Sequence, residues 1–582
     1  MNGKNRRVKG CYSRGLGRAR RTPVVQPKPK STPKPFYDLP VFDSSLKANL
    51  TTEQLALTSL FETYNYLKII EEYSYNNNTP YACIHLRQNN FTNGTVRITK
   101  PGIYILKENI SFEPNSNNDF MPTGPQIASG QYPVGTAGAY HLGFFAAIAI
   151  EATGVILDMN GKTIKQTTLH NLQQRFYANI EMASAPFIPA QGPATFSTPS
   201  NFIAGEKILI KNGTLALSSH HGIHGNTMKD IILQNLSIED FEVAGIALNG
   251  AINSILSNIT IKNTSLNIRV LSTYSQARFI RTFLQTVPAG TTINGKNVNN
   301  VITDLNSGLE EAKNAVMTGN TPSNMFGNSH FDKGYDGNVY GLVLNVNGVV
   351  VNDFIETRPA EAIGNQNIYL QNITIKNIIS RPIEIIALNS VPDEGGAYGG
   401  GRQVGPIGDI LDINPITAGN GTYSANLLSD AQLIIGKSEI ADSNLHFGTT
   451  NITNDIVDWA ENYTVLNSVM NIHGYYFVKG GDSMGHIMKG NIGLFISAGE
   501  NIRVNGFNIN TITSKGTAVG LDASGIVARG GNSRGVIVTG STNINLDSSV
   551  ITNVTTENTN ATAQEIQVLG TSTNVKKDGV PI

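Results

Sequence analysis

The stretch "NLSIEDFEVAGIALNGAINSILSNITIKN", residues 235–263, contains a short motif twice. The motif is an Asn, an apolar residue, a small hydroxyl residue and an Ile, and it begins at Asn235 and again at Asn258, 23 residues later. A related "NGTL" begins at Asn212, 23 residues earlier. Between these points, short apolar runs alternate with Asn and Gly, which is typical of short β-strands joined by tight turns. The spacing therefore predicts stacked units of one repeated length.

A period of 20–24 residues with several short strands predicts a parallel β-helix. Asn tolerates the left-handed backbone of a tight bend, and its amide can bond to the Asn of the next coil. The apolar residues two positions apart then point into a common core. We predict an all-β, right-handed, single-stranded parallel β-helix with three sheets and ~21–24 residues per coil. From Ile502 to Ile544 is 42 residues, which suggests two coils of about 21. The whole rod would have about 11 coils.

The repeat pattern and the local composition divide the chain into four parts. We predict that residues 1–40 form a disordered basic Arg/Lys/Pro arm and that residues 41–94 form an amphipathic helix and cap. Residues 95–570 are predicted to form the β-helix, and residues 571–582 are predicted to form a C-terminal tail. The period breaks at three predicted loop excursions, near 167–200, 272–330 and 390–470.

The predicted helix covers residues 51–73, where Thr51 and Gln54 suggest a capping box. Its expected buried face repeats at intervals of three and four residues. That face consists of Leu57, Leu60, Phe61, Tyr64 and Leu67. We expect it to pack against the core.

Composition limits the class of protein. The 582 residues are 40% apolar and 15% charged, and the two cysteines, Cys11 and Cys83, cannot form a disulfide framework. No apolar run reaches membrane-spanning length, and the N-terminus lacks the apolar core of a secretory signal. We therefore expect no membrane span and an intracellular or virion location.

The N-terminal arm is strongly cationic. Residues 1–37 hold 11 of the 43 Lys and Arg residues and no acidic residue, so the remainder has 32 basic against 43 acidic residues. Three interpretations stay open: binding of nucleic acid or another acidic partner, a targeting segment, or a solvated arm without a dedicated partner. The candidate polyanion-binding residues are Arg6, Arg7, Lys9, Arg14, Arg18, Arg20 and Arg21.

The entry segments "PGIYIL" (101–106), "ISF" (110–112) and "GVILDMNGKTI" (154–164) resemble the first coils of the right-handed parallel β-helix superfamily, the pectate-lyase-like fold. The Asn/Ile-rich composition, the basic arm and "GHIMKGNIGL" (485–494) also resemble β-helix proteins of large DNA viruses. The first resemblance implies enzymes that act on polysaccharides in an outward groove. The second implies a virion or surface-fibre role, for which catalysis is optional.

Alternation along the strands places candidate catalytic residues. In "AGIALNG", Ile246 and Leu248 point inward, so Ala247 points outward, and His224 lies one coil earlier. The same reasoning places Arg269 and Glu384 outward in later coils. A base, a cation and a carboxylate in one groove could support lyase or hydrolase chemistry. Exposed strand positions are usually polar, however, so a plain surface is the simpler interpretation of the column.

Other motifs predict no cofactor and no metal. Alternation places His221 and His224 of "SSHHGIHG" (218–225) on opposite faces of one strand, so they would not chelate one ion. The Gly-rich segment 393–409 lacks the Lys-Ser/Thr of a phosphate-binding loop. The loop "DKGYDGN" (332–338) lacks the bidentate Glu of a calcium loop.

Two functional hypotheses follow from the sequence. The first is a structural or binding β-helix, associated with a virion and anchored through its cationic arm to a polyanion or another partner. The second is a polysaccharide lyase or glycoside hydrolase that uses the outward groove. A glycan ligand suits both hypotheses, and a homotrimer, usual for fibre-like β-helices, suits the first.

Overall fold

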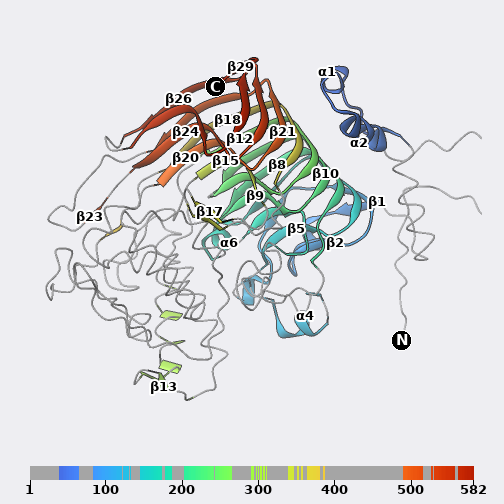
Figure 1. Ribbon diagram of the computed structural model, residues 1–582. Helices are drawn as coiled ribbons and strands as arrows, with labels where there is room; N and C mark the ends of the chain where they lie inside the picture. Colours follow the sequence, from blue (N-terminus) through green and yellow to red (C-terminus); the bar gives the residue numbers. More distant parts are fainter. Residues whose placement is uncertain are drawn as a thin grey trace, which may run out of the picture.

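The computed structural model describes most of the predicted rod. It covers residues 39–63, 83–132, 144–185, 202–264, 339–346, 364–380, 489–514, 530–557 and 561–582, except 119, 121, 130, 174–176 and 242, and short pieces within 290–310 and at 350–352, 355–357, 385–386 and 526–527. Strands from successive coils lie side by side in a long stack, from the blue N-terminal coils to the red C-terminal ones (Figure 1). This arrangement confirms the predicted all-β parallel β-helix.

Two large sheets form the stack. The first has 14 strands: β1 (Cys83–Leu86), β3 (Gly102–Leu106), β4 (Ile110–Phe112), β6 (Thr153–Gln166), β8 (Glu206–Ser218), β10 (Lys229–Phe241), β12 (Ile252–Lys262), β18 (Gln366–Ser380), β21 (Glu500–Asn505), β22 (Asn508–Ser514), β25 (Thr542–Asp547), β26 (Val550–Thr556), β28 (Thr573–Lys577) and β29 (Val580–Pro581). The second has nine: β2 (Val96–Ile98), β5 (Ala146–Ile150), β7 (Ala178–Glu181), β9 (His221–Asn226), β11 (Ala244–Asn249), β15 (Val339–Asn345), β20 (Lys489–Ser497), β24 (Gly530–Thr539) and β27 (Ala563–Leu569).

Short elements complete the described chain. The helices are α1 (Ser44–Lys47), α2 (Thr52–Glu62), α4 (Gly124–Ala128) and α6 (Thr168–Gln173), with 3-10 turns η1 (Gln88–Asn90) and η2 (Ser116–Asn118). Three antiparallel pairs are β13 (Thr292–Ile293) with β14 (Lys296–Asn297), β16 (Val350–Asn352) with β17 (Ile355–Thr357), and β19 (Ile385–Ile386) with β23 (Ile526–Val527). Among the described residues, no helix is long and apolar enough to cross a membrane.

Each long strand of the first sheet bends at an Asn. Asn212, Asn235 and Asn258 have φ angles of 61°, 54° and 53°, in the left-handed region that Asn tolerates better than most residues. The bend divides the sheet into a first face, made of the strand halves before the Asn, and a second face, made of the halves after it. The nine-stranded sheet is the third face. Each coil therefore has the three predicted faces, although two of them share one continuous sheet.

The repeated Asn residues also form a ladder. The Nδ2 of Asn235 donates to the Oδ1 of Asn212 at 3.2 Å, and the Nδ2 of Asn258 donates to the Oδ1 of Asn235 at 3.2 Å. Asn372 continues the series onto Asn258 at 3.1 Å, although 114 residues separate the two in sequence. This confirms the expected role of the motif, which is to make the bend and to link one coil to the next.

The core consists of apolar columns in register with the ladder. Ile238 pairs with Leu215 of the preceding coil and Ile261 of the next, and all three are fully buried.

The prediction of two coils between Ile502 and Ile544 is wrong, because these residues pair directly across β21 and β25. The 42 residues are one coil with an insertion. Within the described chain, the third face has nine strands.

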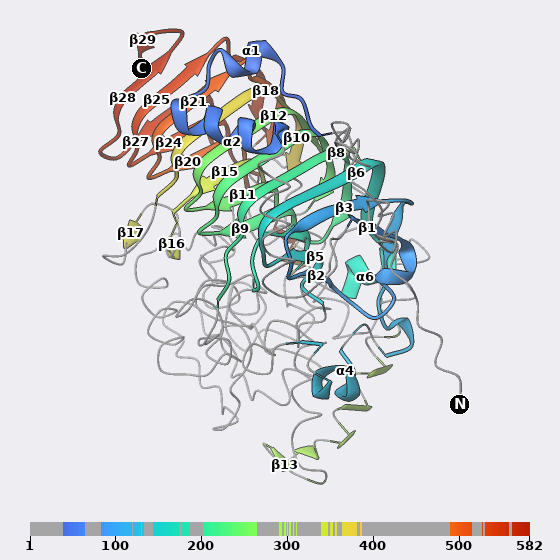
Figure 2. The same ribbon diagram turned by 90° about the vertical axis from the view of Figure 1, so that its right-hand side faces the viewer.

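An N-terminal strap, residues 39–63, crosses the outer side of the first face. Helix α2 lies across the strands β8, β10 and β12 (Figure 2). Leu57 and Phe61 are buried in a cluster with Leu209 and Ile232 of the first face. The capping box of Thr51 and Gln54 forms as predicted.

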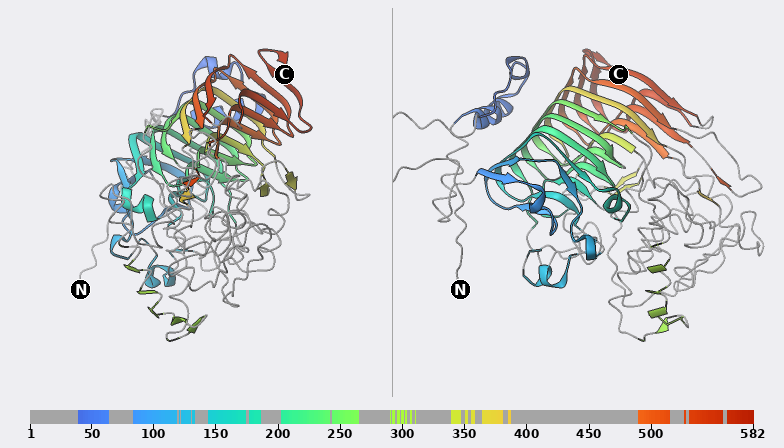
Figure 3. Two further views of the ribbon diagram at one scale, coloured as in Figure 1. Left: turned by 90° about the vertical axis from the view of Figure 1, so that its left-hand side faces the viewer. Right: turned by 180° about the vertical axis from the view of Figure 1, so that it is seen from behind.

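The same strap is seen beside the stack in the rear view (Figure 3, right). Its helix spans Thr52–Glu62, so the predicted residues Tyr64 and Leu67 lie outside the described part of the chain.

Several predicted boundaries differ from the structure. Strand β1 already pairs with β3, so the sheet begins at Cys83 rather than at residue 95. Strand β7 lies inside the predicted excursion 167–200, and β28 and β29 occupy the predicted tail 571–582. These strands are short or end the stack, so their apolar pattern is too brief to signal a strand.

A column of glycines marks the start of the third face. A Cβ at Gly245 would lie 2.8 Å from the carbonyl oxygen of Gly341, and one at Gly341 would lie 2.6 Å from that of Gly493. The backbones of successive coils therefore approach too closely for any side chain. The column consists of Gly222, Gly245, Gly341, Gly493 and Gly535.

Candidate functional site

One line of side chains crosses the outer surface of the third face. In the register of β7, β9, β11, β15 and β20, each residue of the line pairs with the next. The line consists of Glu181, His224, Ala247, Val343 and Phe495. Their neighbours Ile223 and Ile246 are fully buried in the core. The line therefore lies on the outward side, where alternation predicted His224.

Glu181 and His224 form a close acid–base pair. The Nδ1 of His224 lies 2.6 Å from the Oε2 of Glu181, and the two side chains are only 8% and 1% exposed. On the other side of the ring, the Nε2 of His224 lies 3.3 Å from the Nδ2 of Asn249. A proton on Nδ1 bonds to the carboxylate, which leaves Nε2 as an acceptor for the Asn249 amide. Glu181 thus fixes the ring and directs its basic nitrogen toward Asn249.

Burial sets the electrostatics of this pair. Burial raises the pKa of the Glu181 carboxyl, and the neighbouring His224 opposes that rise. The Oε1 of Glu181 is buried, and within the described part of the chain it has no hydrogen-bond partner. A buried acceptor without a partner is costly. The pair therefore differs from a fully satisfied structural ion pair.

The prediction that His221 and His224 lie on opposite faces is wrong. Their rings stack, with centroids 4.8 Å apart and planes 7° apart. A Cβ at Gly222 would lie 2.5 Å from the Cγ2 of the core residue Ile238, so this position faces inward like its neighbour Ile223. Two consecutive inward positions break the alternation and return both histidines to the outer side.

The histidine cluster shows no metal centre. Among the residues that the structure describes, no group of three His, Cys, Asp or Glu side chains is placed to hold an ion. Burial, and then the charges of His220 and His224, hold the pKa of the His221 ring well below its ordinary value.

An aromatic patch follows the acid–base pair along the same face. The rings of Tyr340 and Phe495 lie with centroids 5.8 Å apart and planes 59° apart. They are partly exposed and pack over three small buried residues. The aromatic patch consists of Tyr340 and Phe495 with Ala244, Ala247 and Val343. Apolar and aromatic side chains on the outward side of a sheet are typical of a binding surface.

The structure places only part of the predicted site. His224 lies at the outward position, whereas Arg269 and Glu384 lie outside the described residues. The same holds for every candidate residue of the arm: Arg6, Arg7, Lys9, Arg14, Arg18, Arg20 and Arg21. Sequence reasoning misses Glu181, because it assigns residues 167–200 to a loop excursion. It also misses the aromatic patch, whose signal is the register of "VYGLVL" with "NIGLFI".

No family model and no curated protein sequence matches this chain. Among solved structures, the A-module of the mannuronan C-5 epimerase AlgE6 of Azotobacter vinelandii aligns over 88% of this chain and 94% of its own, at 8% identity and a TM-score of 0.22. Tailspike protein 3 of bacteriophage CBA120 aligns over 89% and 59%, at 7% identity and a TM-score of 0.15.

Proposed function

We propose that this protein binds a polysaccharide along the third face of its β-helix. One observation carries the proposal: the acid–base pair and the aromatic patch lie on a single line, in register across five strands. His224 and Phe495 are three strand spacings apart, or ~14 Å. A chain of several sugar rings that crosses the strands would contact both.

The aromatic patch suits the apolar face of a sugar ring, and the acid–base pair suits its hydroxyl groups. Aromatic rings offer an apolar surface to the C–H groups of a sugar ring, and Tyr340 adds a hydroxyl. Amide, imidazole and carboxylate groups near Asn249 exchange hydrogen bonds with sugar hydroxyls. The mixture of an apolar platform and a few oriented polar groups is what a ligand site requires.

Replacing Phe495 with Ala tests the proposal. Loss of the ring should weaken binding of a recognised polysaccharide about tenfold, or about 1.4 kcal/mol, because stacking area is removed. Affinity gel electrophoresis of the full chain against a panel of neutral and acidic polysaccharides measures the change. Leu55→Ala, which removes an exposed apolar side chain from α2, is the matched control and should bind like the wild type. Equal retardation of Phe495→Ala and wild type would contradict the proposal.

The Glu181–His224 pair favours a second candidate function, a polysaccharide lyase or hydrolase. With Nδ1 held by Glu181, the Nε2 of His224 is the group that would take a proton from the sugar or from an attacking water. Glu181 would act as a positioning residue that stabilises the resulting imidazolium. The role of Arg269 and Glu384 in such a reaction stays a sequence-based proposal.

Replacing His224 with Ala tests this chemistry. If the protein cleaves a glycan, the rate should fall by about 100-fold or more, because general-base catalysis contributes about 10²–10⁴-fold. New reducing ends and the absorbance of unsaturated uronates report hydrolase and lyase products. His85→Ala, at an exposed site on β1, should keep full activity. Activity that survives in His224→Ala would remove the pair from the mechanism.

We also propose that the cationic arm anchors the rod to a polyanion or an acidic partner, as in an intracellular or virion assembly. The support is the charge of residues 1–37, with 11 basic residues and no acid. The full chain should elute from immobilised heparin at higher salt than residues 39–582, because each neutralised charge releases a counterion. Elution of both at the same salt concentration would argue against an anchoring arm.

A further inference from the structure

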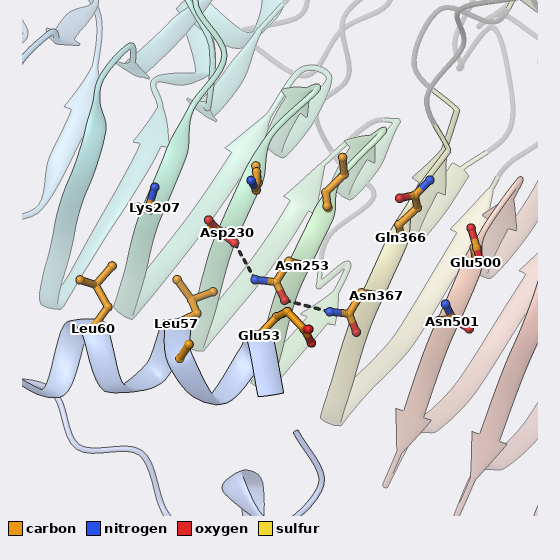
Figure 4. Close-up of a pocket in the computed structure, with 13 residues that line it drawn as sticks. Glu53, Leu57, Leu60, Lys207, Asp230, Asn253, Gln366, Asn367, Glu500 and Asn501 are labelled. Carbon is orange, nitrogen blue, oxygen red and sulfur yellow. Dashed lines mark hydrogen bonds between the residues drawn. The ribbon is translucent and has the colours of Figure 1, made fainter. Parts of the chain in front are cut away.

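A second candidate site lies on a different face of the rod from the line of the third face. It is a groove of about 630 Å³ between helix α2 and the corner where each coil enters the first face (Figure 4). Five strands, β8, β10, β12, β18 and β21, each contribute side chains to its floor. Ala56, Leu57 and Leu60 of α2 form an apolar wall.

The floor is rigid because its residues sit at tight bends. Asp230, Asn253, Asn367 and Asn501 all have left-handed backbones, with φ between 51° and 59°. Their side chains form a corner ladder, distinct from the ladder between the first and second faces. The Nδ2 of Asn253 donates to Asp230 at 2.6 Å, and the Nδ2 of Asn367 donates to the Oδ1 of Asn253 at 2.9 Å.

The corner ladder is interrupted at one rung. It resumes further along, where the Nδ2 of Asn543 donates to the Oδ1 of Asn501 at 3.0 Å. The strands on either side of the gap still pair in register, since Ile368 lies opposite Ile502. Within the described chain, however, neither the Oδ1 of Asn367 nor the Nδ2 of Asn501 has a hydrogen-bond partner. Figure 4 shows the ladder bonds ending at Asn367.

Helix α2 is tied to the floor beside this gap. The Nε2 of Gln54 donates to the backbone carbonyl of Asn367 at 2.9 Å, and the Nδ2 of Asn367 also reaches the Oγ1 of Thr51 at 3.3 Å. Gln54 is only 1% exposed. The apolar wall is therefore held at a fixed place relative to the broken rung.

The charges of the groove nearly cancel. Its lining has two cations, Lys207 and Lys229, and three carboxylates, Glu53, Asp230 and Glu500. A strongly charged ligand would meet side chains of its own sign, so the lining favours a neutral one. Five strands span four spacings, or ~19 Å, which suits an elongated ligand.

We propose that this groove binds a neutral carbohydrate chain, one hydroxyl of which completes the broken rung. A hydroxyl can donate to the Oδ1 of Asn367 and accept from the Nδ2 of Asn501 through one oxygen atom. A peptide group carries its donor and its acceptor on different atoms, so it fits a single rung less well. The apolar wall of α2 would cover the C–H face of the sugar.

Calorimetric titration of the full chain with cellotetraose, maltotetraose, xylotetraose and mannotetraose tests the proposal. At least one should bind saturably. Ala56→Arg, which fills the groove from the helix side, should weaken that binding at least tenfold, and Asn501→Ala should weaken it several-fold. Asn235→Ala is the matched control, because it removes an Asn of the same backbone conformation from the other ladder and should leave the affinity unchanged.

Failure of this proposal is distinguishable from failure of the third-face proposal. Phe495→Ala should leave tetrasaccharide binding in the groove intact, whereas Ala56→Arg should leave polysaccharide binding on the third face intact. Absence of heat with all four tetrasaccharides at millimolar concentration would overturn the groove proposal. Binding that is insensitive to Ala56→Arg would overturn it equally.

Discussion

Replacing Ile238 with Asp is expected to leave no soluble folded protein. Ile238 is fully buried and pairs with Leu215 and Ile261 in the column that runs through the coils. An ionised carboxylate at this position would be desolvated without a partner, at a cost of several kcal/mol. The lost side chain adds about 2–5 kcal/mol. The sum approaches the whole stability of an ordinary domain, about 5–15 kcal/mol.

Soluble yield and the cooperativity of urea unfolding, followed by circular dichroism, measure this effect. Thr260→Asp is the matched control, because Thr260 lies beside Ile261 but points outward. It should fold with a change within about 0.5 kcal/mol. Ile238→Val should cost only about 0.5–1.5 kcal/mol. A soluble Ile238→Asp protein with a cooperative transition would show that the column is not the core.

The fold could be predicted because its main signals are local. A left-handed bend favours Asn or Gly at the bend itself, and a strand with one buried face has apolar residues two positions apart. Asn235 and Asn258 carry both signals within one uninterrupted coil. The helix cap of Thr51 and Gln54 is local in the same sense. None of these features depends on knowing which distant segments pair.

The register across insertions could not be predicted, because pairing partners there are far apart in sequence. Asn258 and Asn372 are adjacent rungs, although 114 residues separate them. The error at Ile502 and Ile544 has the same origin, since an insertion that doubles one coil imitates two coils. The candidate site is the part of the structure that depends most on such distant pairing. Glu181 meets His224 only through the pairing of β7 with β9.

The positions of the histidines were missed for a different reason. Simple alternation assumes that each residue points opposite to its neighbour, and the glycine column breaks this rule at the entry to the third face. The signal is present in the sequence as a Gly followed by Ile, Leu or Val in five successive coils, at Gly222, Gly245, Gly341, Gly493 and Gly535. A glycine needs no explanation in a turn, but a glycine before each core residue of a strand implies close contact between backbones.

Replacing Gly245 with Ala is accordingly expected to destabilise the protein by about 2–3 kcal/mol, near the upper end for overpacked cores. The new Cβ would lie 2.4 Å from the Cγ2 of Ile261 and 2.8 Å from the carbonyl oxygen of Gly341. Relief by a backbone shift is blocked, because Gly341 is itself stacked closely on Gly493. The strain therefore passes along the column into the outward positions of the third face.

The midpoint of urea unfolding, at an unchanged slope, measures the loss for Gly245→Ala. Gly124→Ala is the control, because a Cβ there would meet no atom within 4 Å and the backbone is not left-handed. It should leave the midpoint unchanged or raise it slightly. If Gly245→Ala unfolds at the same urea concentration as Gly124→Ala, the coils can separate at little cost. The stacking of His221 on His224 would then not be held by the backbone. A lower midpoint for Gly245→Ala alone would mean that the close contact between the coils stabilises the rod.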